Sequence, residues 1–559
     1  MKPRSSGAKM RFATFIGLIL HLLAGEVARA QTKIYDSGGV LMPEQAAYDV
    51  TFYDLALQVN PADSTIRGAL TATARIVEPI RWLVLDLDTL LAVDSVVAVE
   101  PKSNTASLPF ERRGGKLWID LQQEKKSGNT VTVQVTYGGR PLVAPIRKGS
   151  WADGFFWART EQGAPWIGIV SVLNGADIWW PTKDHPSDEP DSMALHVTVP
   201  KPLVVAANGR LRKIVENRDG THTYHWFIST PINNYGVTIN IAAYRTITDT
   251  YESVTGEKFS VTFWVLPEHY EKGVRLFPQI LEHLRFYEKL LGPYPFRADK
   301  YGVAETPYLG MENQSIISYG ANFENNPFGF DVLHFHELAH EWWATMVTVA
   351  DWKDWWLHEG FASYMEALHA ETLQGAKAYH DYMARFRPFI QNRKPVAPRA
   401  TQTTRDIYGG DLYYKGAWTL HTLRYLIGKE ALLTSLRRMA YPDSALESVA
   451  DGRQCRFATT DEFQQLVENV SGLKLGWFFE AYLRQPVLPK LVSEKSGETL
   501  RLRWEAPNGL FFPMPIEVRI GNESKRIEMP EGHATITLPN GVNSAIDPQK
   551  WILRAEDNQ

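Results

Sequence analysis

The stretch "HFHELAHEWW", which begins at His334, constrains the fold more than any other part of the sequence. His336, Glu337 and His340 have the spacing H-E-x-x-H, and two histidines four residues apart face one metal ion only on a helix. The surrounding residues "DVLHFHELAHEWWATMV" contain no Gly or Pro, and Asp331 can cap the helix. The sequence therefore predicts a helix that presents two imidazoles to a zinc ion, with Glu337 beside the open position of the metal.

A third ligand distinguishes a metal centre from an ordinary histidine pair, which packs in a core or is solvated at a surface. Catalytic zinc takes three protein ligands and water. Glu359 follows His340 after eighteen intervening residues, within "WWLHEGFASYMEAL", which is typical of a second amphipathic helix. Glu359 is therefore the candidate third ligand. His334, two residues before His336, falls on another helix face and is expected to pack rather than to bind the metal.

The composition is that of a folded protein and excludes several classes. Among 559 residues, hydrophobic side chains make up 44% and charged ones 22%, which excludes a disordered chain. The net charge of -4 gives no basic surplus for nucleic acid as a main partner. Cys455 is the only cysteine, so an intramolecular disulfide cannot form.

The first thirty residues have the pattern of a secretory signal peptide. Basic residues precede the apolar run "FATFIGLILHLLAG", and small residues follow at Ala28 and Ala30. An uncleaved membrane anchor is the alternative, but the run is shorter than the roughly 20 residues that span a bilayer. We expect cleavage after Ala30 and a periplasmic or secreted protein without a stable membrane span.

The pattern of apolar and polar residues changes twice along the remaining sequence. Residues 31–247 alternate apolar and polar residues between turn clusters, which predicts a mainly antiparallel β domain. Residues 248–487 show mostly helical spacing and include the metal motif. Residues 488–559, after a Pro-containing linker, alternate again and predict a small β sandwich. The expected fold is therefore α+β and multidomain.

The order of these motifs resembles the gluzincin aminopeptidase family, which includes aminopeptidase N and the bifunctional leukotriene hydrolase. The family pattern "NEGFA" appears as "HEGFA", with His358 in place of Asn. The resemblance implies a thermolysin-like catalytic domain and one zinc ion held by His336, His340 and Glu359. It also implies that Glu337 is the catalytic base, and the changed neighbour puts the hydrogen bonding around the metal ligands in question.

A second segment, "TPYLGMENQS", resembles the G-x-M-E-N box of this family, with Gly310 directly before Met311. The resemblance implies that Glu312 binds the α-ammonium of a substrate, and a carboxylate suits an ammonium that must leave water. A surface glutamate at a strand end is the alternative. The expected substrate-binding residues of this segment are Tyr308, Gly310, Met311, Glu312 and Asn313.

A third segment, "DIYGGDLYYKGAWTL", resembles the Y-x-K-G helix start of the family. The resemblance assigns Tyr413 to the tetrahedral oxyanion and places Tyr408 near the substrate, with Tyr414 as the competing candidate. Many relatives carry Gln or Glu where an ungapped count places Val172. The amine is then held by Glu312 with another group, such as Glu161, Gln162 or Asn174, or the substrate preference differs.

These residues together predict a zinc-dependent aminopeptidase that acts on peptides with a free N-terminus. Three alternatives stay open at the level of sequence. An epoxide hydrolase on the same scaffold would need a long apolar channel. A zinc endopeptidase would not need Glu312, and a non-catalytic peptide-binding protein would not need Glu337.

Overall fold

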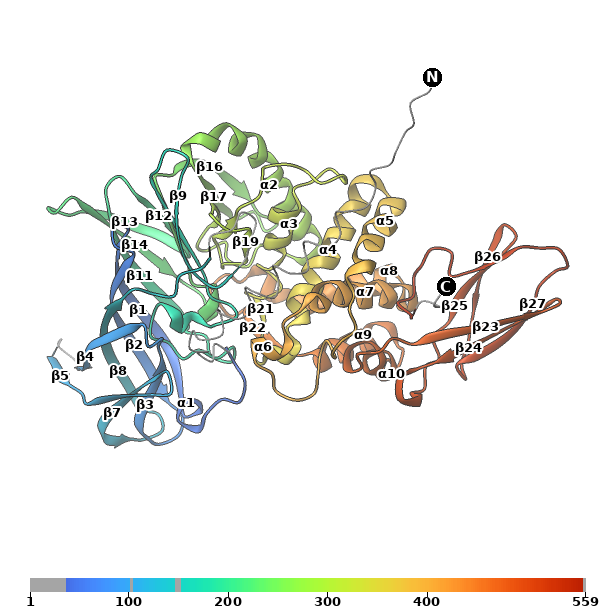
Figure 1. Cartoon of the computed structure of the whole chain (residues 1–559), viewed down its shortest axis with the longest axis horizontal. Coiled ribbons are helices and arrows are strands. Elements are labelled where there is room, and N and C mark those ends of the chain that lie inside the picture. The colour runs from blue at the N-terminus through green and yellow to red at the C-terminus, as the bar shows by residue number, and fades with distance from the viewer. Residues whose placement is uncertain (1–36, 101–103, 146–151, 556–559) are drawn as a thin grey trace, which may run out of the picture. The chain divides into compact units, whose positions relative to one another are not determined.

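The structure is a computed structural model that describes residues 37–100, 104–145 and 152–555. The predicted signal peptide, residues 1–30, lies outside the described residues. Figure 1 shows strands in the N-terminal part of the chain, helices in the middle and strands again towards the C-terminus. The predicted α+β order of a β-rich part, a mostly helical part and C-terminal strands is therefore confirmed.

The N-terminal part is built on an eight-stranded sheet. Its strands are β1 (Tyr48–Asn60), β2 (Thr65–Ile76), β4 (Leu91–Glu100), β5 (Asn104–Ser107), β8 (Thr130–Gly139), β11 (Ser192–Pro200), β13 (Arg210–Glu216) and β14 (Thr221–Ile228). They are ordered β13-β14-β11-β1-β2-β8-β4-β5, and only β1 and β11 pair in parallel. Leu55, Leu57 and Val59 are buried in alternation with more exposed neighbours, which is the period of two that predicted the strand.

Two smaller sheets and a short helix complete this part. The helix α1 (Pro43–Ala46) precedes β1. One sheet, ordered β3-β7-β6, joins β3 (Ile80–Asp86), β7 (Lys116–Lys125) and β6 (Phe110–Arg113). The other, ordered β12-β15-β10-β9, joins β12 (Val204–Ala207), β15 (Ile239–Ala242), β10 (Pro165–Val170) and β9 (Gly154–Arg159). The chain that leaves β10 carries Val172 and Leu173, which matter for the site below.

A five-stranded mixed sheet follows where helix was predicted to dominate. It is ordered β16-β17-β18-β20-β19 and comprises β16 (Arg245–Glu252), β17 (Lys258–Val265), β18 (Tyr301–Glu305), β20 (Ile317–Tyr319) and β19 (Gly310–Met311). The helix α2 (Tyr270–Leu291) connects β17 to β18. The predicted domain boundary at 247/248 falls inside β16. Sequence periodicity missed β18, β19 and β20 because they have two to five residues, all buried, and so show no alternation.

Helices dominate the rest of the middle part. They are α3 (Val332–Ala339), α4 (Trp356–Gln374), α5 (Ala376–Phe386), α6 (Thr404–Ile407), α7 (Gly410–Ile427), α8 (Lys429–Ala440), α9 (Thr460–Ser471) and α10 (Gly476–Phe479). The short strands β21 (Val347–Val349) and β22 (Arg456–Ala458) pair in parallel among them. Every residue of α4 from Trp356 to Ala370 is buried, so this helix is the centre of the helical part.

Helices α4 and α7 cross at a pair of glycines. A Cβ added to Gly360 would lie 2.9 Å from the Cα of Gly416, and one added to Gly416 would lie 2.8 Å from the Cα of Gly360. Both atoms met are backbone, so larger residues would separate the helices. The Arg424 guanidinium of α7 donates two 2.8 Å hydrogen bonds to Glu371 of α4 further along. The crossing therefore fixes α7 against the helix that carries the third metal ligand.

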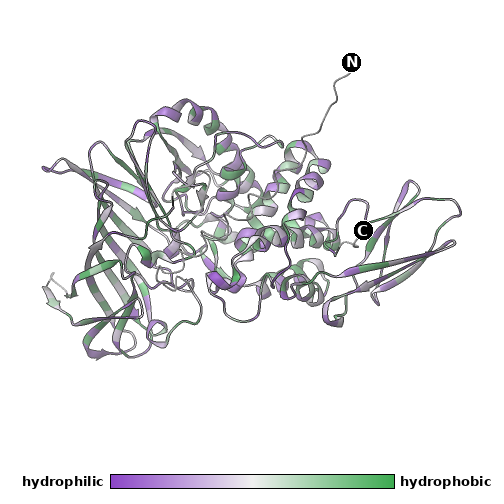
Figure 2. Cartoon of the chain, viewed as in Figure 1, coloured by the Kyte–Doolittle hydropathy of each residue, from purple (hydrophilic) through white to green (hydrophobic). Residues whose placement is uncertain are grey.

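The C-terminal strands form two three-stranded sheets. One is ordered β23-β24-β27, from β23 (Lys490–Ser496), β24 (Thr499–Glu505) and β27 (His533–Thr537). The other is ordered β26-β25-β28, from β26 (Glu523–Ile527), β25 (Ile516–Ile520) and β28 (Ser544–Ile546). Figure 2 shows hydrophilic and hydrophobic residues interspersed along these strands and along the helices. Across the described ranges, no helix has the length and apolar character needed to cross a membrane.

Buried carboxyl groups gather in the segments around β9 and β11. Asp153 accepts a hydrogen bond from the backbone N–H of Asn174 through one oxygen, while its other oxygen has no partner among the described residues. Burial raises the pKa of Asp153 to about 7, and burial together with Asp86 raises the pKa of Asp184 to about 7. Burial also raises the pKa of Glu189 to about 8. Asp153 and Asp184 accept hydrogen bonds from the N–H groups of Asn174 and Ala176, so they hold the chain after Val172, and their burial costs free energy when they are ionised.

We predict that Asp153→Asn stabilises the protein at alkaline pH and not at acidic pH. The folded state binds the Asp153 proton with a pKa of about 7, against about 3.9 in the unfolded chain. The wild type therefore loses stability as pH rises from about 4 to about 7, whereas Asn does not titrate. Urea unfolding should show an advantage of the variant that is larger at pH 8 than at pH 5 by about 3 kcal/mol. An advantage that is equal at both pH values would contradict the assignment.

Candidate metal centre

The helix that carries the two histidines begins as predicted and ends earlier than predicted. Asp331 is the N-cap of α3, and its side chain accepts a 2.9 Å hydrogen bond from the backbone N–H of His334. The helix ends at Ala339 with His340 as its C-cap, which keeps helical dihedral angles (φ -69°, ψ -15°). The four-residue spacing therefore still places His336 and His340 on one face, although the chain beyond His340 turns instead of continuing the helix.

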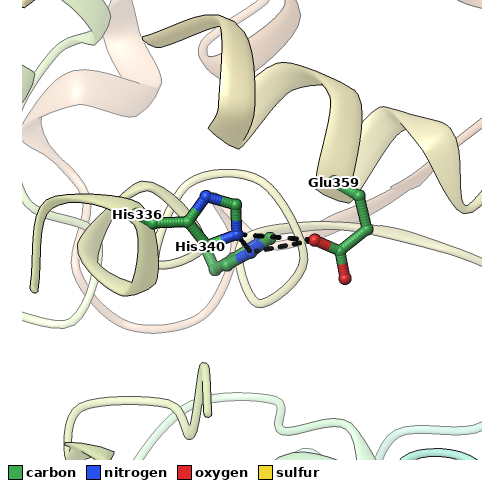
Figure 3. Close-up of side chains that lie close together, drawn as sticks. All are labelled: His336, His340 and Glu359. Carbon is green, nitrogen blue, oxygen red and sulfur yellow. Dashed lines mark hydrogen bonds and ion pairs between the residues drawn. The ribbon is translucent and has the colours of Figure 1, made fainter. Parts of the chain in front are cut away.

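Three side chains converge on one point between α3 and α4. The Nε2 atoms of His336 and His340 are 3.3 Å apart, and Oε2 of Glu359 lies 3.6 Å from the first and 3.5 Å from the second. Figure 3 shows the two imidazoles and the carboxylate facing one another. Tetrahedral zinc with ligand distances of about 2.0–2.2 Å separates its ligand atoms by about 3.3–3.5 Å. The spacing of the three atoms therefore fits a zinc ion.

The outer nitrogens of both imidazoles are held by acceptors. Nδ1 of His336 lies 2.7 Å from Oε1 of Glu366, and Nδ1 of His340 lies 2.8 Å from the carbonyl oxygen of Trp343. Because a carboxylate and a carbonyl only accept, both Nδ1 atoms carry protons and both Nε2 lone pairs can point to the metal position. Oε2 of Glu359 is buried without a hydrogen-bond partner among the described residues. The two Nε2 lone pairs and the unpaired Glu359 oxygen are all electron donors directed at one point, which is the environment that binds a cation.

Glu366 was missed by sequence reasoning. It lies seven residues after Glu359 on α4, which is two helical turns and therefore the same face. The Tyr382 hydroxyl of α5 donates a 2.7 Å hydrogen bond to the second oxygen of Glu366. The spacing could have identified Glu366 as a group that orients a metal ligand.

The charges of the three ligands support one another. Burial disfavours a charge on Glu359, but the nearby imidazoles of His336 and His340 outweigh it and hold the pKa of this carboxyl well below its usual range. Burial likewise opposes protonation of His336, yet Glu359 and Glu366 raise the pKa of its imidazole well above its usual value. The Glu359 carboxylate and the two imidazoles therefore stabilise one another's charged forms.

The two other histidines near the motif are not metal ligands. His334 contacts Nδ1 of His283 at 2.9 Å and the Tyr301 hydroxyl at 2.9 Å, as expected for a packed residue. His358, in the family's Asn position, is fully buried, and neither of its ring nitrogens has a hydrogen-bond partner among the described residues. Burial lowers the pKa of His358 to about 3, so it is neutral. His358 therefore makes no side-chain hydrogen bond to the metal ligands.

A cavity of about 240 Å³ opens beside the metal ligands. It combines the three candidate ligands with residues from five separate segments. The lining residues are Val172, Leu309, Gly310, Glu312, Leu333, His336, Glu337, His340, Trp355, Glu359, Tyr408 and Tyr413. Leu309, Leu333 and Trp355 were not predicted, because an apolar side chain carries no sequence signal that distinguishes a cavity wall from a core.

The G-x-M-E-N box contributes alternate residues to the cavity. Gly310 and Glu312 line it, whereas Met311 is packed in the core. Asn313 donates to the Gly236 carbonyl, and the Tyr308 hydroxyl donates to the Ile169 carbonyl. Tyr308, Met311 and Asn313 were predicted to bind substrate, but the structure places them outside the cavity lining. Met311 and Asn313 alternate with Gly310 and Glu312 along an extended chain, which turns neighbouring side chains to opposite sides. This alternation does not account for Tyr308, whose hydroxyl is instead bonded to the Ile169 carbonyl.

Glu337 packs against the backbone of Gly310. A Cβ added to Gly310 would lie 2.5 Å from Oε1 of Glu337 and 2.7 Å from Leu333, so only glycine leaves room for this carboxylate. Burial raises the pKa of Glu337 to about 8, with His336 opposing the shift and Glu312 adding to it. The predicted base is therefore buried in the cavity and poised to hold a proton.

Two tyrosines form another side of the cavity. Tyr413, in the first turn of α7, stacks on His336 with ring centroids 6.1 Å apart. Burial and then Glu359 raise its pKa well above the usual value, so its hydroxyl stays protonated. Tyr408 also lines the cavity, whereas Tyr414 packs on Phe386 at 5.3 Å and is not among the lining residues. The prediction of Tyr413 over Tyr414 agrees with these positions.

Glu312 is the lining carboxylate available for a substrate amine. Burial raises its pKa, with His340 opposing and Glu359 adding to the shift. Val172 also lines this cavity. Glu161, Gln162 and Asn174, the other groups considered for the amine, are not among the lining residues.

This site belongs to a metallohydrolase type: a His-His-Glu metal group with a free carboxylate beside it. Two family models match the chain. The Peptidase M1 N-terminal domain matches residues 50–235 and the Peptidase family M1 domain matches residues 276–482, together more than half of the chain. The chain therefore belongs to peptidase family M1.

Curated relatives and solved structures agree with this family. Aminopeptidase N of Haemonchus contortus is 24% identical over 483 residues, which are 79% of this chain and 48% of the relative. Probable aminopeptidase 1 of Saccharolobus solfataricus is 22% identical over 390 residues, 65% of this chain and 48% of the relative. The chain thus spans about half the length of these relatives. A solved M1 zinc metallopeptidase of Deinococcus radiodurans is 25% identical with a TM-score of 0.62, and the match covers 79% of this chain and 94% of that one.

We predict that Glu366→Gln weakens zinc binding about 10- to 100-fold, because His336 loses the anionic acceptor that orients it. Competition against a chelator of known zinc affinity measures the effect. Tyr382→Phe, which removes one hydrogen bond from Glu366 and leaves the carboxylate, should cause a smaller loss. Equal zinc affinity in Glu366→Gln and the wild type would show that Glu366 does not orient His336.

Proposed function

We propose that the chain is an aminopeptidase that uses one zinc ion to remove N-terminal residues from peptides. The observation that carries this proposal is the presence of Glu312 in the same cavity as His336, His340, Glu359 and Glu337. The named relatives are aminopeptidases, and one solved neighbour is an M1 zinc metallopeptidase variant bound to a Tyr-Ser-Ala substrate. These findings support the same reaction for this chain.

The size of the cavity supports removal of single residues. Its volume is about 240 Å³, below the roughly 300–1,000 Å³ of sites that enclose drug-sized ligands. It therefore suits the first residue of a peptide, held by its ammonium group. Glu312 provides the opposite charge that a desolvated ammonium requires, so the scissile bond is the first one.

Each residue of the site then has a separate role in the proposed reaction. His336, His340 and Glu359 would hold the zinc ion, which would supply a Lewis acid that acidifies water and polarises a carbonyl. Glu337 accepts a proton from the attacking water and delivers it to the amine that leaves. Tyr413 stays protonated and donates a hydrogen bond to the oxyanion that develops on the substrate carbonyl. Glu312 holds the ammonium throughout.

We predict that the chain hydrolyses aminoacyl fluorogenic amides with a free amine and leaves their N-acetyl counterparts intact, because acetylation removes the charge that Glu312 binds.

We also predict that Glu337→Gln lowers kcat at least about 100-fold while zinc content stays unchanged, since Glu337 is not a ligand. Both are measured by initial rates and metal analysis. Equal cleavage of acetylated substrates would contradict the role of Glu312, and inactivity of the wild type on all substrates would contradict the proposed function.

We also propose that the chain is exported and that residues 1–30 are removed. The basic residues before the apolar run and the small residues Ala28 and Ala30 support this address. N-terminal sequencing of the protein from a cell fractionation should find a periplasmic or secreted chain that begins at Gln31. An intact Met1 terminus would contradict the proposal.

A further inference from the structure

A short segment far from the motifs joins two walls of the cavity. It consists of Ser37, Gly38 and Gly39 and is called the 37–39 segment. The backbone N–H of Ser37 donates to the Leu173 carbonyl at 3.2 Å, and the Ser37 carbonyl accepts from the N–H of Thr404 at 3.0 Å. The N–H of Gly39 donates to the Gln402 carbonyl at 3.1 Å. The segment therefore bonds the chain after β10 on one side and the chain before α6 on the other.

The same segment packs against a third part of the chain. Gly38 has φ +83°, and a Cβ there would lie 2.7 Å from Nε1 of Trp352 and still nearer to its Cδ1. Trp352 is fully buried, so its ring has little room to move. Only glycine therefore fits at position 38, both for its backbone conformation and for its closeness to the indole ring.

The three residues that the segment contacts, Leu173, Thr404 and Trp352, are each connected to a residue that lines the cavity. Leu173 follows Val172 in sequence. Thr404 is the first residue of α6, and Tyr408 is the C-cap of that helix, with its N–H bonded to the Thr404 carbonyl at 2.8 Å.

Trp352 supplies the third connection, because its ring centroid lies 4.7 Å from that of Trp355. The Trp355 ring in turn lies 5.7 Å from the ring of Tyr408. Val172, Trp355 and Tyr408 come from three distant parts of the sequence, and all three line the cavity.

We propose that the 37–39 segment positions Val172, Trp355 and Tyr408 as one wall of the substrate cavity. This inference rests on the proposed peptidase function. Leu173 and Thr404 are also joined directly, because the Thr404 hydroxyl donates to the Leu173 carbonyl at 2.6 Å. The residues that the segment and this hydrogen bond contact directly, which are Leu173, Thr404 and Trp352, are not metal ligands. Loosening these contacts changes how the substrate is held and leaves zinc binding intact.

Gly38→Ala tests the proposal, with Gly256→Ala as the matched control. Gly256 has the same φ of +83°, but a Cβ there meets no atom within 4 Å, so the control carries the backbone strain without the clash. Gly38→Ala should lower kcat/KM for free-amine amides about tenfold, because small displacements of a binding wall cost this much. Zinc content should not change, and backbone amides in 402–408 should exchange with deuterium faster. The control should match the wild type in all three measurements.

Thr404→Val is the second variant, in case Gly38→Ala does not fold. It keeps the shape of the side chain and removes the hydrogen bond to Leu173, so a smaller fall in kcat/KM at full zinc content is expected. An active wild type whose Gly38→Ala and Thr404→Val variants keep its kcat/KM overturns this inference alone. An inactive wild type overturns the proposed function and this inference with it, so the two failures are distinguishable.

Discussion

The site depends on the burial of the Glu359 carboxylate between His336 and His340. A buried carboxylate is stable only next to opposite charge, and the two imidazoles supply it when protonated, as a metal ion does when bound. The arrangement requires both Nδ1 atoms to be held from outside, by Glu366 and by the Trp343 carbonyl. It also requires a helix that buries a glutamate, which is why α4 lies in the middle of the helical part with nearly all of its residues covered.

Helix α7 reaches this carboxylate because two glycines let it come close. Gly360 follows Glu359 directly, and Gly416 lies three residues after Tyr413, about one helical turn. The crossing at these glycines therefore sets the position of the Tyr413 hydroxyl relative to the metal ligands. The Y-x-K-G pattern thus has two separate purposes: its tyrosine faces the cavity, and its glycine allows the close contact that brings the tyrosine there.

The sequence predicts the metal ligands well because helix geometry converts spacing into position. His336 and His340 need only one helix, and Glu359 needs a second helix lying across it. Residues whose role depends on strand direction are harder to predict, as Met311 and Asn313 show, because an extended chain turns alternate side chains away from the cavity. The short buried strands β18–β20 were missed for want of alternation. Contacts such as that of Gly38 with Trp352 depend on tertiary packing, which no local pattern encodes.

Three carboxylates, Glu312, Glu337 and Glu359, line one cavity of about 240 Å³. Burial raises the pKa of the first two, and the charge of Glu359 raises both further. Any cation that enters the cavity lowers these pKa values, since it stabilises the ionised forms. A bound metal and a substrate ammonium therefore each relieve part of the same repulsion. In the proposed reaction, the ammonium is both the group that Glu312 binds and the counter-charge that lets Glu312 stay ionised beside Glu337. Binding of the free amino group and ionisation of Glu337 would then be coupled through charge alone.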